Sequence, residues 1–390
     1  MVQVISGLRP YVRLSVASAA AAMLAAGSAQ AATVTRSVFG TAADGQTVYL
    51  FTLKNHHGMT VKFSTRGGSI VEIDAPDRKG VEDNLVIGKA DFAGWESGAN
   101  AILGRYANRI GGGGFTLDGT FYKLSGPNPK TNVVIHGGTD NYFHKLWKGE
   151  AFQHGDEAGA TLSLVSPDGE SGFPGELTIK VNYSLDEHNR LKLEYWATTT
   201  KPTVINLSNH ANFNIGGYDS GPVYNQVLQV FASHYTPTDA AQVPTGEIAP
   251  VAGTPFDFRK PTELLQRLYS NDPQMMIGKG LDHNFVLDKP PGAKGPVLAA
   301  KIYDPKSGRR MAVFTTEPGV QIYSSNGVGN ALGQNNRPIR QSDGLSFETQ
   351  HYPDAPNKPN FPTTTLRPGE TFHSVTEYVF SVDGKGNLKG

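Results

Sequence analysis

Cysteine is absent from the 390-residue chain. Its absence excludes disulfide bonds, thiol catalysis, thiolate-bound zinc and iron–sulfur clusters. Neither sign of charge is in excess, because 35 lysines and arginines balance 35 aspartates and glutamates. The chain therefore lacks the basic field that would hold a phosphate backbone, and nucleic acid is not expected as a partner.

A hydrophobic run long enough to cross a bilayer is also missing. The apolar stretch Leu14–Ala26 has about 13 residues, whereas a membrane-spanning helix needs about 20. It follows Arg9 and Arg13 and precedes Ala29-Gln30-Ala31, which has the small-x-small pattern of a signal-peptide cleavage site. We therefore expect residues 1–31 to be a cleaved secretory signal peptide, the mature chain to lie in a bacterial periplasm, and no span in the mature form.

Helical periodicity is confined to short stretches such as Pro261–Tyr269. Apolar and polar residues alternate instead, most clearly in Leu177–Leu185 and Leu191–Tyr195, and the intervening turn predicts a β-hairpin. Further strands are expected at Val48–Leu53, Met59–Ser64, Ser69–Asp74, Ala160–Val165, Gln226–Ala232, Met311–Thr315, Val320–Tyr323 and Phe372–Val382, with Thr33–Gly45 as a leader into the first of them. Because strands do not alternate with helices, an all-β fold is expected: one large antiparallel β-sandwich domain over residues 32–390.

Polar groups are dense in the segment 100–117, where Arg105, Asn108 and Arg109 stand in a short apolar context. The guanidinium of Arg109 can bind two hydroxyls at once, and the amide of Asn108 can both donate and accept. The alternative interpretation is a surface loop with solvated arginines.

Two histidines stand at places that favour a site. His136 directly follows the apolar strand 133–135 and precedes two glycines, so it is either a site residue at a strand end or a structural histidine. His210 lies in the segment 205–214 with four asparagines and a serine, which must pair with one another, with the backbone or with a polyhydroxylated ligand. An imidazole exchanges protons near neutral pH, so His210 is a candidate acid or base.

Carboxylates stand in two further strands. Asp282 and His283 lie at the mouth of one strand, but no His-Glu-x-x-His pattern or comparable spacing accompanies them, so no metal site is expected. Glu348 lies inside an apolar strand, where burial would raise its pKa toward the range of a general base. Its alternative role is that of a buried partner for an arginine or a backbone amide.

Six motifs, taken in order, resemble those of the aldose 1-epimerases, also called galactose mutarotases. They are GRYANRI, IHGG, NLSNHANFN, LDHNFVL, TTEPGVQIY and FETQHYPDAPNKPNFPTTTLRPGE, and the resemblance extends from near Tyr49 to near Val382. It implies a galactose-mutarotase-like β-sandwich with a carbohydrate site on a concave sheet face. It also implies a general base at Glu348, a general acid at His210, and positions that hold sugar hydroxyls at Asn108, Arg109, His136, Asp282 and Gln321.

The implied reaction interconverts the α and β anomers of free hexoses such as glucose and galactose. One base and one acid suffice for ring opening and closure, so no cofactor and no metal are expected, and the partner is a small monosaccharide. The chain departs from the family at Ala211-Asn212, where many members carry Ser-Tyr after the acid histidine, and this departure concerns a wall of the sugar pocket.

Two other function classes stay open on the sequence. The first is a non-catalytic carbohydrate-binding module on the same sandwich. The second is a carbohydrate-cleaving enzyme, because glycoside hydrolases commonly use two carboxylates and Asp282 with Glu348 could form such a pair.

Overall fold

The computed structural model describes residues 31–96, 98–329 and 331–383. The expected signal peptide therefore lies outside the described residues, apart from Ala31. From Ala31 onward the chain forms one compact unit. In the three described ranges, no helix is both long enough and apolar enough to cross a membrane.

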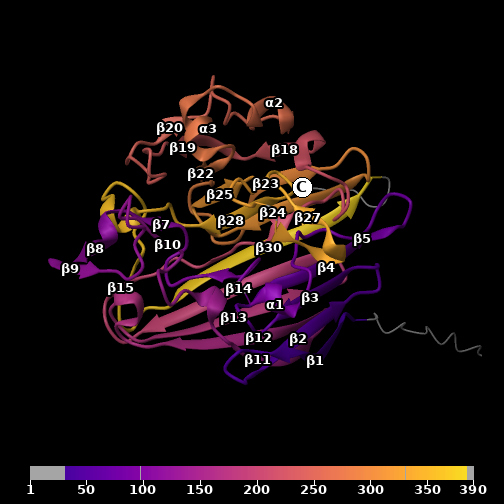
Figure 1. The fold of residues 1–390 in the computed structure, drawn as a ribbon, viewed down its shortest axis with the longest axis horizontal. Coiled ribbons are helices and arrows are strands. Elements are labelled where there is room, and N and C mark those ends of the chain that lie inside the picture. Colours follow the sequence, from indigo (N-terminus) through magenta and orange to yellow (C-terminus); the bar gives the residue numbers. More distant parts are fainter. Residues whose placement is uncertain (1–30, 97, 330, 384–390) are drawn as a thin grey trace, which may run out of the picture. The chain divides into compact units, whose positions relative to one another are not determined.

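Antiparallel sheets dominate this unit, in agreement with the expected all-β class (Figure 1). The largest sheet has nine strands in the order β11 (Lys148–His154), β12 (Glu157–Ser166), β13 (Leu177–Leu185), β14 (Arg190–Thr199), β30 (Phe372–Val382), β24 (Arg309–Thr315), β23 (Val297–Tyr303), β18 (Val227–Val230) and β21 (Thr262–Glu263). The second has six strands in the order β17 (Asn212–Phe213), β28 (Leu345–Gln350), β25 (Gly319–Tyr323), β22 (Asp282–Leu287), β19 (Ala232–Thr236) and β20 (Ala249–Pro250).

Smaller sheets and short helices complete the described part of the chain. A five-stranded meander comprises β1 (Thr33–Thr41), β2 (Thr47–Lys54), β3 (Thr60–Ser64), β4 (Ile70–Pro76) and β5 (Glu82–Asn84). Two-stranded ribbons pair β6 (Ile102–Leu103) with β16 (Ser208–Asn209), β7 (Arg109–Ile110) with β10 (Val134–Ile135), β8 (Gly114–Leu117) with β9 (Thr120–Lys123), β15 (Thr203–Val204) with β29 (Thr365–Leu366), and β26 (Ala331–Leu332) with β27 (Pro338–Ile339). The α-helices are α1 (Phe92–Trp95), α2 (Leu265–Leu268) and α3 (Pro273–Gly278).

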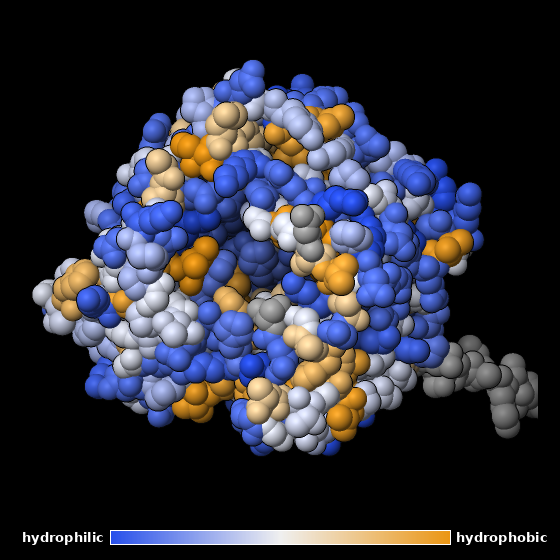
Figure 2. Space-filling view, viewed as in Figure 1, coloured by the Kyte–Doolittle hydropathy of each residue, from blue (hydrophilic) through white to orange (hydrophobic). Residues whose placement is uncertain are grey.

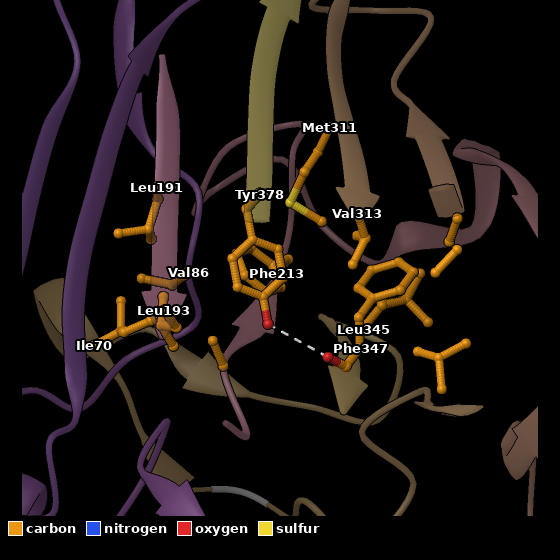
Figure 3. Close-up of a cluster of buried hydrophobic side chains, with 14 of the residues drawn as sticks. Ile70, Val86, Leu191, Leu193, Phe213, Met311, Val313, Leu345, Phe347 and Tyr378 are labelled. Atoms are coloured by element: carbon orange, nitrogen blue, oxygen red, sulfur yellow. Dashed lines mark hydrogen bonds between the residues drawn. The ribbon is translucent and has the colours of Figure 1, made fainter. Parts of the chain in front are cut away.

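Side chains of the nine-stranded sheet, the six-stranded sheet and the five-stranded meander together form the hydrophobic core (Figure 3). Leu193 of β14 and Tyr378 of β30 reach it from one side, and Phe347 of β28 reaches it from the other. The Tyr378 hydroxyl donates to the carbonyl oxygen of Phe347 at 3.4 Å. Successive side chains of a strand point to opposite faces, so Phe347 in the core places Glu348 on the outer face of β28.

The predicted hairpin is confirmed as β13 and β14, and the last predicted strand coincides with β30. Three local expectations are wrong. The leader expected over Thr33–Gly45 is itself an edge strand, β1, which pairs with β2. The run Gln226–Ala232 divides between β18 and β19, which belong to different sheets. Helix formation in Pro261–Tyr269 is limited to α2, because Thr262 and Glu263 pair with β18 as an edge strand.

Candidate functional site

Three neighbouring strands of the six-stranded sheet present polar side chains on one face. Residues paired directly across an antiparallel sheet share a face. Glu348 of β28 pairs with Gln321 of β25, and Gln321 pairs with Asn284 of β22. Two residues along each strand, and so on the same face, Ser346 pairs with Tyr323 and Tyr323 pairs with Asp282. The face opposite the core therefore brings together Glu348, Gln321 and Asp282 from three separate motifs.

The ribbon of β7 and β10 supplies the next part of the site. The backbone N–H of His136 donates to the carbonyl oxygen of Asn108 at 2.9 Å, which joins the two motifs that hold these residues. Gly137 follows with φ of +94°, and a Cβ there would lie 2.2 Å from the carbonyl oxygen of Gly104. The glycine after His136 is thus required both by its backbone conformation and by the close approach of another segment.

His210 lies between β16 and β17, where its backbone N–H donates to the carbonyl oxygen of Ala101 at 2.9 Å. Its Nε2 is 3.4 Å from Oε1 of Glu348, and its Nδ1 is 3.2 Å from Oγ of Ser346. The other carboxylate oxygen of Glu348, Oε2, accepts a 3.4 Å hydrogen bond from Nδ2 of Asn108. A proton-exchanging imidazole and a carboxylate therefore lie side by side.

Asp282 is held by three donors. Its Oδ2 accepts from a terminal nitrogen of Arg109 at 2.9 Å and from Nε2 of Gln242 at 3.2 Å. Its Oδ1 accepts from Nε2 of Gln321 at 2.7 Å. Arg109 also donates to Oε1 of Gln242 at 3.0 Å and to Oδ1 of Asn108 at 3.3 Å. This network fixes the positions of both an acceptor, Asp282, and a cation, Arg109.

These groups surround a cavity of about 400 Å³. Its walls include Asn108, Arg109, Ile135, His136, His210, Asn212, Gln242, Ile277, Gly278, Lys279, Asp282, Tyr323, Asn326, Gly327, Val328 and Glu348. Figure 2 shows a hollow with hydrophilic residues around it near the middle of the face, at the place where Figure 1 shows β25 and β28. A polar cavity of this size suits a small, polyhydroxylated ligand.

Burial shifts the proton affinities of two groups in the cavity in opposite directions. It raises the pKa of Glu348, a side chain that is 2% exposed, and the charge of Asp282 acts in the same sense. His210, Arg109 and the amide of Asn108 oppose that rise. Burial, together with the neighbouring His210 and Arg109, lowers the pKa of His136 well below 6.5. The site therefore offers a basic carboxylate and a neutral imidazole donor.

The structure brings together all seven residues expected from the sequence. Six of them line the cavity. The seventh, Gln321, does not line it but donates a hydrogen bond to Asp282, which does. Asn212 also lines the cavity, at the departure noted in the sequence. Three further residues of the site were not expected from the sequence: Gln242, Tyr323 and Ser346. The spacing could have revealed Tyr323 and Ser346, because each lies two positions from an expected site residue on a strand and so shares its face.

The neighbour of Asp282 takes no part in the site. His283 points to the opposite face of β22, where its ring packs 4.5 Å from that of Phe256. Within the described ranges, no group of three or more histidine or acidic side chains could hold a metal ion.

Comparison with known proteins identifies relatives along most of the chain. A family model described as Aldose 1-epimerase matches residues 49–379. The galactose mutarotase of Sus scrofa is 39% identical over 360 residues, which cover 90% of this chain and 99% of the relative. The aldose 1-epimerase of Escherichia coli K12 is 35% identical over 344 residues, which cover 87% and 97% of the two chains.

Solved structures agree with these relatives. The galactose 1-epimerase from Lactobacillus acidophilus superposes with a TM-score of 0.78 and 28% identity, covering 90% of this chain and 99% of that one. The aldose epimerase homologue from C. elegans gives a TM-score of 0.75 at 27% identity, covering 84% and 97%. The fold is therefore that of the galactose mutarotases, as the sequence motifs implied.

Proposed function

Since the chain belongs to the aldose 1-epimerase family, whose members are epimerases acting on carbohydrates, we propose that it interconverts the α and β anomers of free hexoses such as glucose and galactose. The observation that carries this proposal is the contact of 3.4 Å between Nε2 of His210 and Oε1 of Glu348. Mutarotation requires a base at the anomeric hydroxyl and an acid at the ring oxygen. Both of these oxygens are bonded to C1, so the base and the acid must lie side by side.

Glu348 is the proposed base. Its carboxylate takes the proton of the C1 hydroxyl, and burial supports this role because it raises the pKa of the carboxyl and so its affinity for that proton. His210, protonated on Nε2, gives its proton to the ring oxygen, and the C1–O5 bond breaks to leave the open-chain aldehyde. Rotation about C1–C2 followed by the reverse proton transfers closes the ring as the other anomer.

The remaining residues are proposed to hold the sugar. Arg109 and Asn108 donate to its hydroxyls, His136 donates from its neutral ring, and Asp282 accepts. Gln321 acts on the sugar through Asp282, to which it donates at 2.7 Å. The three donors to Asp282 hold both of its carboxylate oxygens in place in the wall of the cavity, where they can accept from a hydroxyl of the sugar.

Polarimetry of freshly dissolved α-D-glucose and α-D-galactose tests the proposal. The purified chain should speed the approach to the equilibrium rotation, and the variants Glu348→Gln and His210→Ala should each lose most of that acceleration. Sugar binding without acceleration in the wild-type protein would instead identify a non-catalytic carbohydrate-binding protein. Release of reducing ends from an oligosaccharide would identify a hydrolase.

We also propose that residues 1–31 are a signal peptide and that residues 32–390 form one epimerase domain in the periplasm. The charged start, the apolar run of about 13 residues and the small-x-small site support export, and the family match begins only at residue 49. Expression of the full chain in a Gram-negative host, followed by fractionation and N-terminal sequencing, tests this. A periplasmic product starting near Ala32 is expected, and a cytoplasmic product with its original N-terminus would refute it.

A further inference from the structure

Asn212 lines the cavity, and its amide connects the wall of the cavity to the proposed acid. Strand β17 pairs with β28 so that Asn212 lies directly opposite Ser346. Oδ1 of Asn212 accepts hydrogen bonds from the hydroxyls of Ser346 at 2.9 Å and Ser325 at 3.0 Å. Ser346 is fully buried, so its hydroxyl has no access to water.

The number of protons on Ser346 determines the direction of its second contact. A serine hydroxyl has one proton to donate, and that of Ser346 goes to Asn212. The Ser346 oxygen, 3.2 Å from Nδ1 of His210, then accepts a hydrogen bond from the N–H at this nitrogen. Nδ1 of His210 therefore keeps its proton, and Nε2, which faces Glu348 at 3.4 Å, is the nitrogen that gains and loses one.

We propose that Asn212 is a positioning residue that acts through Ser346 to hold His210 in the tautomer required of an acid at Nε2. This inference rests on the proposed function, since it assigns the proton-exchanging nitrogen of the proposed acid. After Nε2 has given its proton to the ring oxygen, the neutral imidazole still has a donor at Nδ1 and an acceptor at Nε2, ready for the return step.

Removal of the Asn212 acceptor would reverse this arrangement. The Ser346 hydroxyl would then be free to turn and donate to Nδ1 of His210. That contact stabilises the neutral ring with its proton on Nε2 and leaves the protonated ring without an acceptor at Nδ1. His210 would remain in place, but its Nδ1 would no longer be held as a donor.

Substitutions of similar size test the role of the Asn212 oxygen. Asn212→Leu removes the acceptor, and Asn212→Asp keeps an oxygen at the same place. We expect Asn212→Leu to lower kcat for mutarotation about ten-fold with little change in KM, and Asn212→Asp to retain activity within about three-fold of wild type. Equal loss in both variants, or a rise in KM alone, would overturn the proposal and leave Asn212 as a wall of the sugar pocket.

A double-mutant cycle tests whether Asn212 acts through Ser346. Ser346→Ala alone should lower kcat, and adding Asn212→Leu to it should have no further effect, because the oxygen that Asn212 positions is already gone. Additive losses would contradict the proposal. Ser325→Ala is the matched control, because the Ser325 hydroxyl lies 3.0 Å from the same Asn212 oxygen, and equally close to the carbonyl oxygen of Gly344, but does not contact His210.

Nitrogen-15 NMR of histidine-labelled protein gives a readout that does not depend on activity. The His210 signals, identified by their loss in His210→Ala, should show a protonated Nδ1 at alkaline pH in the wild-type protein. In Asn212→Leu the proton should move to Nε2. A wild-type ring with its proton on Nε2 would refute the inference, whereas a wild-type protein without mutarotase activity would refute the proposed function, so the two failures are distinguishable.

Discussion

The imidazole Nδ1 of His136 accepts a hydrogen bond from the backbone N–H of Asn108 at 3.1 Å. A nitrogen that accepts carries no proton, so the proton of the neutral ring is on Nε2. Burial keeps the ring neutral, because it lowers the pKa of His136 well below 6.5, as do the nearby His210 and Arg109. The backbone of one motif thus fixes His136 of another as a neutral donor in the wall of the cavity.

The first prediction concerns this neutral donor. We expect His136→Asn to raise KM for the sugar roughly ten-fold with a smaller effect on kcat, because one hydrogen bond to a hydroxyl is lost. Asparagine is a suitable replacement because it tolerates the positive φ of 52° at this position. In the wild-type protein KM should stay flat from about pH 8 to pH 5.5. A KM that rises toward pH 5.5 in the wild-type protein but not in His136→Asn would show that His136 is not held neutral.

The second prediction separates activity from stability at Glu348. Burial raises the pKa of this carboxyl in the fold, so the folded protein holds its proton at a pH where the unfolded chain has lost it. Ionising Glu348 therefore costs stability as the pH rises above 4.5. Glu348→Gln should lower mutarotase activity at least a hundred-fold. At about pH 8 it should raise the free energy of unfolding measured in urea.

A second buried glutamate provides the control. Glu317 is 3% exposed and pairs with Nδ1 of His351 at 2.6 Å, and it is not among the residues that line the cavity. Glu317→Gln removes the charged partner of His351, so it should lower stability while mutarotase activity persists. A loss of both activity and stability in Glu348→Gln would contradict the assignment of Glu348 as a base whose buried charge lowers the stability of the folded protein.

The third prediction concerns the geometry of Arg109. Its guanidinium contacts Asp282, Gln242 and Asn108 at the same time, which a lysine ammonium on a flexible chain cannot reproduce. We expect Arg109→Lys to raise KM about ten-fold although the charge is kept. Arg310→Lys on the surface is the matched control and should leave both kinetic constants unchanged. Wild-type kinetics in Arg109→Lys would show that Arg109 supplies charge alone.

Residues close together in the sequence differ in how far the sequence predicts their roles. Arg105 and Arg109 share one motif, yet Arg105 is buried and donates to the carbonyl oxygens of Pro174 and Gly175. Its role is to hold a loop, and no local pattern distinguishes the two arginines, because their partners lie in distant segments. Alternation does predict that Glu348 and Phe347 face opposite sides of β28.

The place of Gln242 in the site could not be predicted from the sequence. It lies in a turn with φ of 60° and meets Arg109 and Asp282, which are distant from it in the sequence. No periodicity or motif marks such a residue, because its contacts depend on how the loop crosses the sheet. The motifs predicted the strands and their polar ends, whereas the loops that close the cavity follow from tertiary packing.

The last prediction concerns His283, whose side chain lies on the opposite face of β22 from that of Asp282. Its Nδ1 accepts from the backbone N–H of Asp282 at 3.4 Å, and its Nε2 lies 3.1 Å from Oε1 of Gln274, to which it donates. The ring is 1% exposed, and burial lowers the pKa of His283 to about 4. His283 is therefore neutral in the fold over a pH range in which the unfolded chain binds a proton.

Because His283 is neutral in the fold, protonation of the unfolded chain lowers the stability of the protein as the pH falls. The contribution of a neutral His283 is fully present above pH 6.5 and is lost as the pH falls from 6.5 to about 4, a loss of roughly 3 kcal/mol at the end of that range. We expect His283→Gln to lower stability at about pH 7.5 but to make the decline toward pH 4.5 shallower, as measured by urea unfolding at several pH values. The exposed His234 is the control, since His234→Gln should leave the slope unchanged. An equal slope in wild type and His283→Gln would mean that His283 is protonated in the folded protein. The hydrogen bond to Gln274 and the contact with Phe256 allow this only if the backbone N–H of Asp282 no longer donates to Nδ1 of His283.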